Sequence, residues 1–444
     1  MNNAKSNVPA AGVSAQEKHP KGLYVLFATE MWERFGFYTL SAMLALYLRD
    51  NIRGMGWTEV RVATLVSYYL MFVYASPLVG GWIADKFIGY KMAISIGGIF
   101  LGTGYFLLFW PSVFSLYLAL ACIVIGNGLF KPSVSTLVGN LYPEGSKLKD
   151  SAYNIFYMGI NIGAFLAPLV AELVQRRLGF RPAFTAAGFG MVLCLLIFGS
   201  FRKWVEVKGS VADRPASTVK RAEGSTQAGV INNVPESKRV MALVGIFAIV
   251  IVFWMLFHQN TLTLIYFAND HTDWSAIGEV SGVLSAAINP FWVVTLTFPL
   301  VGFWEWLDRK GKQPSTPAKM AIGMSLIACA FYLMSLASLS GGNAERVSPM
   351  WLISAYAIVS LGELMLSPMG LSLVSKVAPV RMRGIMMGGW FVATAIGNKL
   401  TAIGAYWSVW SHSAFFAILA TLALAMSILL WALLKPLKKA MPGI

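Results

Sequence analysis

Long apolar runs separated by short polar stretches fill most of the chain. Twelve runs are long enough for the about 20 residues that a membrane-spanning helix needs. They lie at 22–48, 60–84, 92–110, 114–138, 152–174, 182–201, 239–268, 281–305, 318–338, 350–376, 384–408 and 412–434. The pattern predicts an all-α membrane protein with 12 transmembrane helices.

A polar segment over 202–238 divides the runs into two sets of six, and it contains no run that could span a bilayer. Two bundles of six helices are typical of the major facilitator fold, in which substrate binds near the midplane between the bundles. We therefore predict an N-terminal cytoplasmic tail at 1–21, a six-helix bundle at 22–201, a cytoplasmic linker at 202–238, a second six-helix bundle at 239–434 and a cytoplasmic tail at 435–444.

Composition supports a membrane protein, because 57% of the residues are hydrophobic, 12% are charged and mean hydropathy is +0.64. A soluble protein carries about twice that charged fraction. The net charge of +15 reflects Lys and Arg that gather in the linker, in alternate loops and in the C-terminal tail. This bias predicts a multi-pass protein in the lipid bilayer of the cell (inner) membrane, with both termini cytoplasmic. No basic stretch in a soluble segment is interleaved with stacking aromatic residues, so we expect no nucleic-acid partner.

Three charged side chains, Glu30, Glu33 and Arg34, interrupt the first apolar run. Each costs about 2.5–3.5 kcal/mol at the bilayer centre by insertion scales, so they are expected to pair and to face away from lipid. Helical spacing places Glu30, Arg34 and Tyr38 on one face, with Glu33 beside Arg34. That face indicates the lining of a polar cavity, which makes transport the first functional hypothesis.

The sequence predicts neither a metal site nor an organic cofactor. Cys122, Cys194 and Cys329 lie far apart in apolar runs and lack the spacing of metal ligands. The chain also lacks a Gly-x-x-x-x-Gly-Lys-Ser/Thr loop for ATP. Because a few titratable side chains occur within the apolar runs, we expect protons to be the coupling ion.

The loop after the second run reads GWIADKFIGYK at 81–91. It resembles the loop motif of major facilitator transporters, in which an Asp and basic residues latch neighbouring helix ends and Gly permits a tight turn. We therefore expect Asp85 and Lys86 to act in a gate. The alternative is an ordinary cytoplasmic turn.

Four further motifs occur in order: EMWERFGFY at 30–38, GLFKP at 128–132, FYMGINIGA at 156–164 and GELMLSPMG at 362–370. With them the sequence resembles the proton-dependent oligopeptide transporter (POT) family from about Tyr24 to about Leu430. The resemblance implies a proton-coupled symporter, not an enzyme, that imports di- and tripeptides by alternating access. Many bacterial members insert two extra helices between the halves, and the segment at 202–238 is too short and polar to hold them. We expect a monomer.

A peptide is a zwitterion with an amide backbone, so its site needs a cation, an anion and hydrogen-bonding groups. The resemblance assigns the cations to Arg34 and Lys131 and the anion to Glu363 in the other half. Arg34 offers a planar fork for a carboxylate and Lys131 a point charge. The remaining substrate residues that the resemblance implies are Tyr38, Tyr69, Asn161, Asn289, Ser367 and Trp390.

Proton coupling is assigned mainly to Glu30 and Glu33, which are close enough for their protonation to be coupled. Protonation of one would loosen its hold on Arg34 and free the guanidinium for the peptide. The family usually carries Glu where this chain has His258, and the Arg partner of that Glu where it has Ser41. The acidic and the basic residue of that family pair are both replaced by uncharged residues here, so no unpaired charge is left behind. We therefore expect a hydrogen bond between Ser41 and His258, and His258 as a proton-sensitive gate.

Other interpretations stay open at this point. The same fold could carry another small organic ion, such as an amino acid or nitrate, although nitrate would not need Glu363. A membrane-embedded enzyme is less favoured, because no second acidic cluster completes a metal site. At single positions, Lys131 could pair structurally or snorkel, and Tyr69 and Trp390 could be packing residues. Asn289 could bind backbone groups that the next residue, a proline, leaves free.

Overall fold

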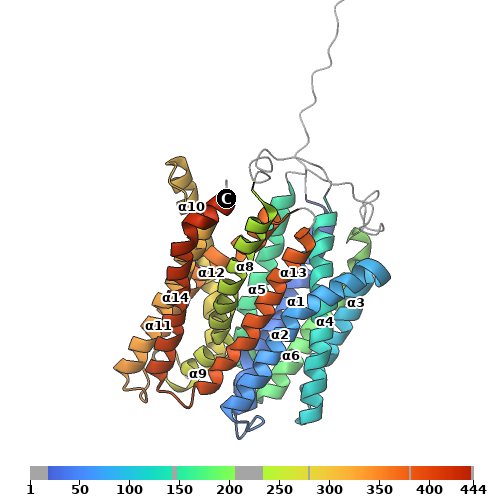
Figure 1. Ribbon diagram of the computed structural model, residues 1–444. Coiled ribbons are helices and arrows are strands. Elements are labelled where there is room, and N and C mark those ends of the chain that lie inside the picture. The colour runs from blue at the N-terminus through green and yellow to red at the C-terminus, as the bar shows by residue number, and fades with distance from the viewer. Residues whose placement is uncertain (1–18, 143–147, 206–233, 279–280, 380–381, 442–444) are drawn as a thin grey trace, which may run out of the picture.

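The computed structural model describes residues 19–142, 148–205, 234–278, 281–379 and 382–441. Within these residues the fold is helical, and Figure 1 shows long helices joined by short loops at both ends. Twelve of the helices have 18 residues or more: α1 (Lys21–Arg49), α2 (Glu59–Ile83), α3 (Tyr90–Leu107), α4 (Val113–Asn140), α5 (Leu148–Leu178), α6 (Phe180–Phe201), α8 (Glu236–Phe257), α10 (Ile288–Arg309), α11 (Thr316–Ser340), α12 (Pro349–Val377), α13 (Arg383–Leu400) and α14 (His412–Ala440).

Each predicted apolar run corresponds to one of these helices. By length and composition, nine stretches of the described chain are apolar enough to cross a membrane. The segment around α1 is outside that set, since Glu30, Glu33 and Arg34 lower its apolar character. The helix forms nonetheless, because the remainder of its 29 residues supplies apolar side chains and 21 of its residues are buried.

Two predicted spans are broken rather than continuous. The run at 239–268 becomes α8, a 3-10 turn η5 (His258–Thr261) and the short α9 (Thr263–Asp270). The run at 384–408 becomes α13 and a 3-10 segment η9 (Thr401–Tyr406). The break after α8 places His258 at a helix end, and Leu262 adopts φ −135° and ψ −87° there. A third 3-10 segment, η7 (Gly282–Ala287), leads into α10.

The helices pack as two groups of six. In the first, α1 contacts α5 and α6, while α4 contacts α2 and α3. In the second, α11 contacts α12 and α14, and α8 contacts α13 and α14. The groups, here called the first and second halves, meet mainly where α2 contacts α13 and where α5 contacts α10 and η7. The predicted linker at 202–238 lies mostly outside the described residues, apart from η2 (Arg202–Val205) and the start of α8.

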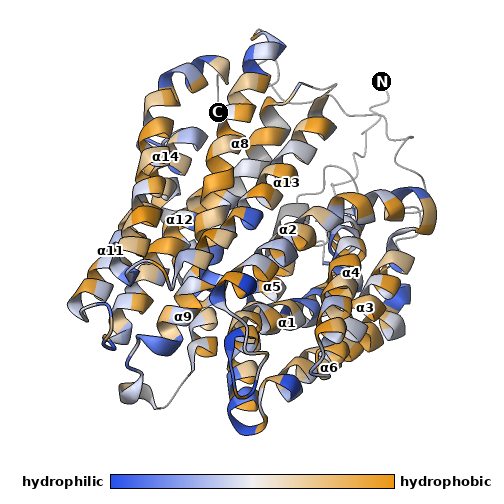
Figure 2. Cartoon of the chain, turned by 60° about the horizontal axis from the view of Figure 1, so that its bottom comes forward, coloured by the Kyte–Doolittle hydropathy of each residue, from blue (hydrophilic) through white to orange (hydrophobic). Residues whose placement is uncertain are grey.

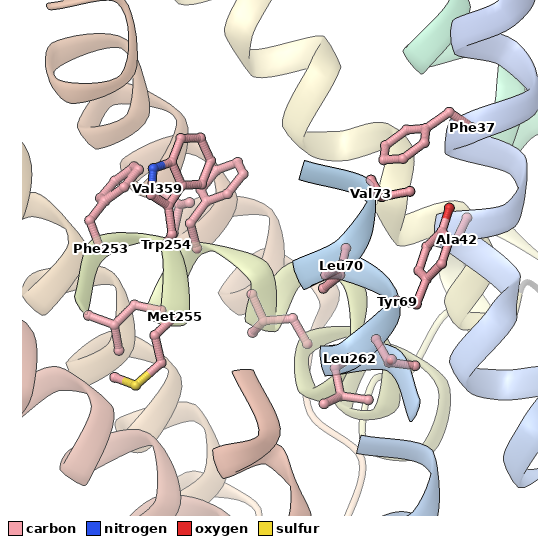
Figure 3. Packing of buried hydrophobic residues seen from close by; sticks show 14 of the residues in the cluster. Phe37, Ala42, Tyr69, Leu70, Val73, Phe253, Trp254, Met255, Leu262 and Val359 are labelled. Carbon is pink, nitrogen blue, oxygen red and sulfur yellow. The ribbon is translucent and has the colours of Figure 1, made fainter. Parts of the chain in front are cut away.

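Most buried hydrophobic side chains of the described chain form one continuous core that includes residues of both halves. Figure 2 shows that polar residues concentrate in the loops, whereas the long helices are largely apolar. Figure 3 shows part of the core, with Phe37, Tyr69 and Val73 on one side and Phe253 and Trp254 of α8 on the other. Charged side chains within this core therefore require a specific explanation.

Candidate functional site

Arg34 lies at the centre of a buried charged group in the middle of α1. Its Nε lies 3.2 Å from Glu30 Oε1 and donates a hydrogen bond to Glu33 Oε2. Only 2% of Glu30, 0% of Glu33 and 4% of Arg34 is exposed. The prediction that these charges pair on α1 is confirmed.

Both carboxylates contact the same nitrogen of Arg34, and this leaves other polar atoms unused. Among the described residues, Arg34 Nη2, Glu30 Oε2 and Glu33 Oε1 have no hydrogen-bond partner. The guanidinium carbon lies 5.1 Å from the centre of the Phe37 ring. Because unpartnered buried polar atoms are rare, the group has capacity for a ligand: donors for an anion at Nη2 and acceptors for protons on the carboxylates.

Glycines on α5 allow close packing against α1 at the level of Arg34. A Cβ at Gly163 would lie 2.3 Å from the Met31 carbonyl oxygen and 3.0 Å from Arg34 Cβ. A Cβ at Gly159 would lie 3.0 Å from the Phe27 carbonyl oxygen. Both glycines belong to the FYMGINIGA motif. A physical role of that motif is therefore to bring α5 against the charged segment of α1.

Lys131 is positioned by a similar contact between α2 and α4. A Cβ at Gly80 would lie 2.1 Å from the Gly128 carbonyl oxygen, so the two backbones touch one turn before Lys131. Pro132 inside α4 also removes the amide that would bond the Gly128 carbonyl. Lys131 Nζ lies 5.0 Å from the centre of the Tyr74 ring. The half-buried ammonium thus faces an aromatic surface of α2.

Tyr74 is a candidate site residue that the sequence analysis missed. Besides Lys131, its ring lies 5.3 Å from the His258 ring and 6.2 Å from the Trp254 ring. It therefore connects a cation of the first half with α8 of the second. The sequence offers little signal for it, because α2 carries several tyrosines and only packing distinguishes them.

Glu363 of α12 is held by a neighbouring amide. Asn289 Nδ2 donates to Glu363 Oε2 at 3.0 Å and to Ser360 Oγ at 2.9 Å. Ser360 Oγ donates in turn to the Asn289 carbonyl at 3.4 Å. No Lys or Arg within the described chain forms an ion pair with Glu363. Asn289 thus positions the carboxylate, and the carboxylate is available to a cationic ligand.

Two tyrosines interact electrostatically with these charged groups. Tyr38, on α1, is close enough to both Arg34 and Glu363 to interact with them electrostatically. Tyr157, on α5, is similarly close to Glu363 and Tyr38. The predicted cation of the first half and the predicted anion of the second half therefore share one region lined by tyrosines.

Asn161 and Tyr69, two other predicted substrate residues, differ in whether their polar groups have partners. Asn161 Nδ2 donates to the Tyr157 carbonyl oxygen at 2.9 Å, within its own helix. Tyr69 is 4% exposed and points toward α1 beside Ala42, as Figure 3 shows. Its hydroxyl has no partner in the described part of the chain. The Tyr69 hydroxyl is therefore available to a ligand, and it lies close to the charges of α1.

The remaining two predicted substrate residues belong to α12 and α13. Ser367 is half-buried, one turn beyond Glu363. Trp390 is buried, and its Cη2 would lie 1.7 Å from a Cβ at Gly370. Its ring centre lies 6.3 Å from that of Phe247. These contacts of Trp390 are packing contacts among α8, α12 and α13.

The expected hydrogen bond between Ser41 and His258 is wrong. Ser41 Oγ donates to the Phe37 carbonyl oxygen at 2.9 Å, one turn earlier on α1. Both ring nitrogens of His258 lack a partner among the described residues, and the ring stacks on Trp254 at 5.5 Å. A hydroxyl in an apolar helix commonly bonds its own backbone, and here that bond removes Ser41 from the predicted gate.

A different pair joins the halves at the end of the bundle where α1 finishes, which we call the α9 end. Arg49 Nη2 lies 2.5 Å from Asp270 Oδ2, and Arg49 Nη1 lies 3.5 Å from Glu59 Oε1. The guanidinium carbon also lies 4.3 Å from the centre of the Tyr266 ring. Sequence reasoning missed this pair. Arg49 directly follows the predicted run at 22–48, and Asp270 lies two residues after the predicted run at 239–268.

Further polar contacts tie the halves together toward the same end. Glu172 of α5 accepts hydrogen bonds from the Ser281 amide at 2.8 Å and from the Ser281 hydroxyl. Lys399 Nζ of α13 donates to Ser67 Oγ at 3.1 Å and lies 3.8 Å from the centre of the Tyr68 ring. The α9 end is therefore closed in this conformation.

The predicted loop motif forms a tight turn at the opposite end. Asp85 and Lys86 lie in a short π-helical turn, η1 (Ala84–Ile88), and Gly89 follows at φ 73°. Both charged side chains are exposed, and Lys86 Nζ lies 5.4 Å from the centre of the Trp82 ring. The turn and its glycine agree with the motif, and the gate role of Asp85 and Lys86 stays a prediction.

Comparison with known proteins bears directly on this arrangement. The family model described as Major Facilitator Superfamily matches residues 26–398. Dipeptide and tripeptide permease A of Klebsiella pneumoniae (strain 342) is 33% identical over 88% of this chain and 85% of its own. A di-/tripeptide transporter of Lactococcus lactis subsp. lactis (strain IL1403) is 30% identical over 95% of this chain and 96% of its own.

The crystal structure of a peptide transporter POT in complex with sulfate matches with a TM-score of 0.87 and 29% identity, covering 97% of each chain. The chain belongs to the POT family of the major facilitator superfamily. As a POT family member it is a membrane transporter and not an enzyme. The predicted all-α major facilitator fold with 12 transmembrane helices in two bundles is confirmed.

Proposed function

We propose that this POT family protein is a proton-coupled symporter that imports di- and tripeptides. One observation carries the proposal: Arg34 of the first half has an unpartnered Nη2, while Glu363 of the second half has no Lys or Arg partner in the described chain. A zwitterion has the complementary charges at its two ends. The names of the two relatives, which refer to dipeptides and tripeptides, agree with this substrate class.

In this proposal the peptide carboxylate binds Arg34 Nη2 and the ammonium of Lys131, and the peptide ammonium binds Glu363. Tyr38 and Tyr74 contribute aromatic surface and hydroxyl groups between these ends. Because the anchoring charges belong to the ends of any short peptide, side-chain selectivity is expected to be broad. A ligand held by both halves also favours their closure around it.

Proton coupling follows from the shared Nε of Arg34. When Glu30 or Glu33 takes up a proton, it loses its charge and holds the guanidinium less strongly. Arg34 then binds a peptide carboxylate better. One proton moving inward down about 100 mV supplies about 2.3 kcal/mol, and one pH unit adds about 1.4 kcal/mol. Together these support roughly 500-fold accumulation.

The gate assignment changes with the structure. We propose that Arg49 and Asp270 form the main polar latch of the α9 end, in place of Ser41 and His258. His258 remains a candidate proton carrier, because its ring nitrogens lack partners among the described residues. The distribution of Lys and Arg supports cytoplasmic termini, and with that orientation the α9 end faces outward from the inner membrane. One chain holds the complete site, and a monomer therefore suffices.

The test is uptake of a labelled dialanine into proteoliposomes with an imposed pH gradient. We expect accumulation when the outside is acidic, loss of accumulation on addition of a protonophore, and competition by unlabelled dialanine. Free alanine is the discriminating control, since its two charges lie closer together than those of dialanine. Equal competition by alanine would overturn the peptide assignment, and accumulation that persists with the protonophore would overturn proton coupling.

A further inference from the structure

A groove separates the start of α8 from the end of α14. The two helices contact each other and lie side by side in Figures 1 and 2. The groove has a volume of about 580 Å³, within the range of small-molecule sites. Its lining includes Lys238, Met241 and Gly245 of α8, and Leu433, Leu437 and Lys439 of α14. The groove's lining contains none of the candidate substrate or proton-coupling residues described above.

The shape of the groove depends on small side chains of α8. Ala242 and Gly245 lie on the lining, opposite larger side chains such as Leu437. A Cβ built at Gly245 would meet no atom within 4 Å, so the space beside it is open. The groove is therefore an apolar slot that neighbouring side chains of the described chain leave unfilled.

Charge is concentrated at one end of this slot. Lys238, in the first turn of α8, and Lys439, in the last turn of α14, are both exposed and both border the groove. Lys435 and Lys438 lie on the same end of α14. The remainder of the lining named above is aliphatic. An occupant must therefore combine a negative head with a long apolar body.

We propose that this groove binds one anionic phospholipid, with its phosphate between Lys238 and Lys439 and its acyl chains along Gly245 and Leu433. The proposal commits to a lipid because α8 and α14 both span the membrane, so the slot opens where acyl chains are present. Basic side chains at the end of a membrane helix attract anionic headgroups, and here two of them converge on one apolar slot. The inference does not depend on which substrate the protein transports.

The test is native mass spectrometry of the purified full chain titrated with palmitoyl-oleoyl phosphatidylglycerol or with the matching phosphatidylcholine. We expect one phosphatidylglycerol to remain bound at detergent concentrations that remove phosphatidylcholine. Gly245→Leu fills the open space, and should weaken retention of phosphatidylglycerol by about tenfold or more. Its control is Gly302→Leu on α10, where a Cβ also meets no atom within 4 Å.

The charged end is tested separately, in case Gly245→Leu lowers the yield of folded protein. The double variant Lys238→Gln/Lys439→Gln keeps the slot and removes both positive charges, so retention should again fall by about tenfold or more. Lys312→Gln, an exposed site between α10 and α11, serves as the matched control and should bind normally. Equal retention of both lipids by the natural chain, or undiminished phosphatidylglycerol binding by the double variant, would overturn the proposal.

Discussion

Arg49 of α1 donates to Asp270 of α9 with 2.5 Å between Nη2 and Oδ2, and this bond joins residues 221 positions apart in the sequence. The pair connects the two halves at the α9 end, where Glu59 and the Tyr266 ring also contact the same guanidinium. Its side chains are 20% and 33% exposed, so solvent screens the attraction.

Asp270→Asn should shift the protein toward conformations that are open at the α9 end. An ion pair of this exposure contributes about 0.2–1 kcal/mol, so the ratio of open to closed forms should rise by roughly 1.4-fold to fivefold. The change can be measured as distances between spin labels at Ile52 and Ser275, which belong to different halves and are exposed. The natural cysteines, including exposed Cys329, are first replaced by serine.

The charge-swapped double variant Arg49→Asp/Asp270→Arg is the companion measurement. It restores opposite charges and should return the distance distribution toward that of the natural chain. If the single and double variants have the same distribution as the natural chain, the pair does not act as a latch.

Arg34→Lys should weaken peptide binding by a factor of about ten or more, although the charge is retained. Lysine has one terminal nitrogen, which the two carboxylates of α1 would occupy, whereas arginine keeps Nη2 for the ligand. Binding is measured by displacement of a fluorescent peptide. Arg61→Lys is the control, because Arg61 is exposed and stacks on Trp57 at 3.7 Å outside the site. Normal affinity of the Arg34 variant would contradict the proposed contact.

Glu363→Gln should abolish uptake of free peptides while leaving the hydrogen bond from Asn289 possible. The same substitution at the exposed Glu305 of α10 should have no effect. N-acetylation of the peptide separates the contacts: an acetylated peptide has no ammonium, so its residual binding should be indifferent to Glu363→Gln. Equal losses for free and acetylated peptides would show that Glu363 does not bind the ammonium.

Glu30→Gln or Glu33→Gln should remove accumulation driven by a pH gradient but spare exchange of external peptide for internal peptide. Exchange needs only alternating access with substrate bound, whereas accumulation also needs a proton carried with each peptide. Accumulation and exchange are measured in the same proteoliposomes, with and without a pH gradient. Gradient-driven uptake by both variants would place the coupling site elsewhere, with His258 as the next candidate.

Stability of the α9 end should fall as pH falls below about 6.5. His271 lies just outside the span that ends at Asp270, and burial lowers its pKa from 6.5, with Arg49 and Arg346 acting in the same direction and Asp270 opposing. The folded state therefore binds the proton more weakly than the unfolded state, so stability is present above pH 6.5 and is lost below it.

The measurement for this prediction is the unfolding temperature in detergent between pH 7.5 and pH 5. His271→Gln removes the titrating ring and should flatten the fall. Acid-sensitive groups remote from His271 contribute a slope common to both proteins, whereas the His412 ring lies 4.3 Å from the His271 ring and is coupled to it. The difference between the two curves therefore reports on this histidine pair. Identical curves would mean that protonation of His271 does not affect the fold.

Much of the fold could be predicted from the sequence, because the cost of exposing polar backbone to lipid makes each long apolar run a helix. The charges of α1 were equally predictable: residues four apart on a helix face each other, so Glu30 and Arg34 must meet. The breaks after Phe257 and Leu400 were not predicted. The first break is the polar stretch His258–Thr261, and the second follows Asn398 and Lys399. Apolar residues on both sides nevertheless made each run long enough to be taken as one span.

The contacts between halves were the least predictable part. Ser41 and His258 looked like partners because each replaces a charged family residue, but a local bond to the Phe37 carbonyl satisfies the serine. Asn289 is predicted to bind peptide, and its amide also holds Glu363, a contact that the sequence did not predict. Tyr74 shares its helix with other tyrosines, and only three-dimensional packing separates it from them. Such choices depend on competing partners that lie far apart in the sequence.

In the Arg34 guanidinium, Nε contacts both carboxylates while Nη2 has no partner among the described residues, and this arrangement has a thermodynamic consequence. If a proton on Glu30 or Glu33 makes Nη2 a better partner for the peptide carboxylate, linkage requires that the bound peptide favour that proton by the same factor. The two ligands then recruit each other, and the doubly loaded carrier is populated beyond what either affinity alone would give. This cooperative loading needs no additional moving part, since Nε of Arg34 contacts the proton-binding carboxylates while Nη2 of the same side chain is left for the peptide.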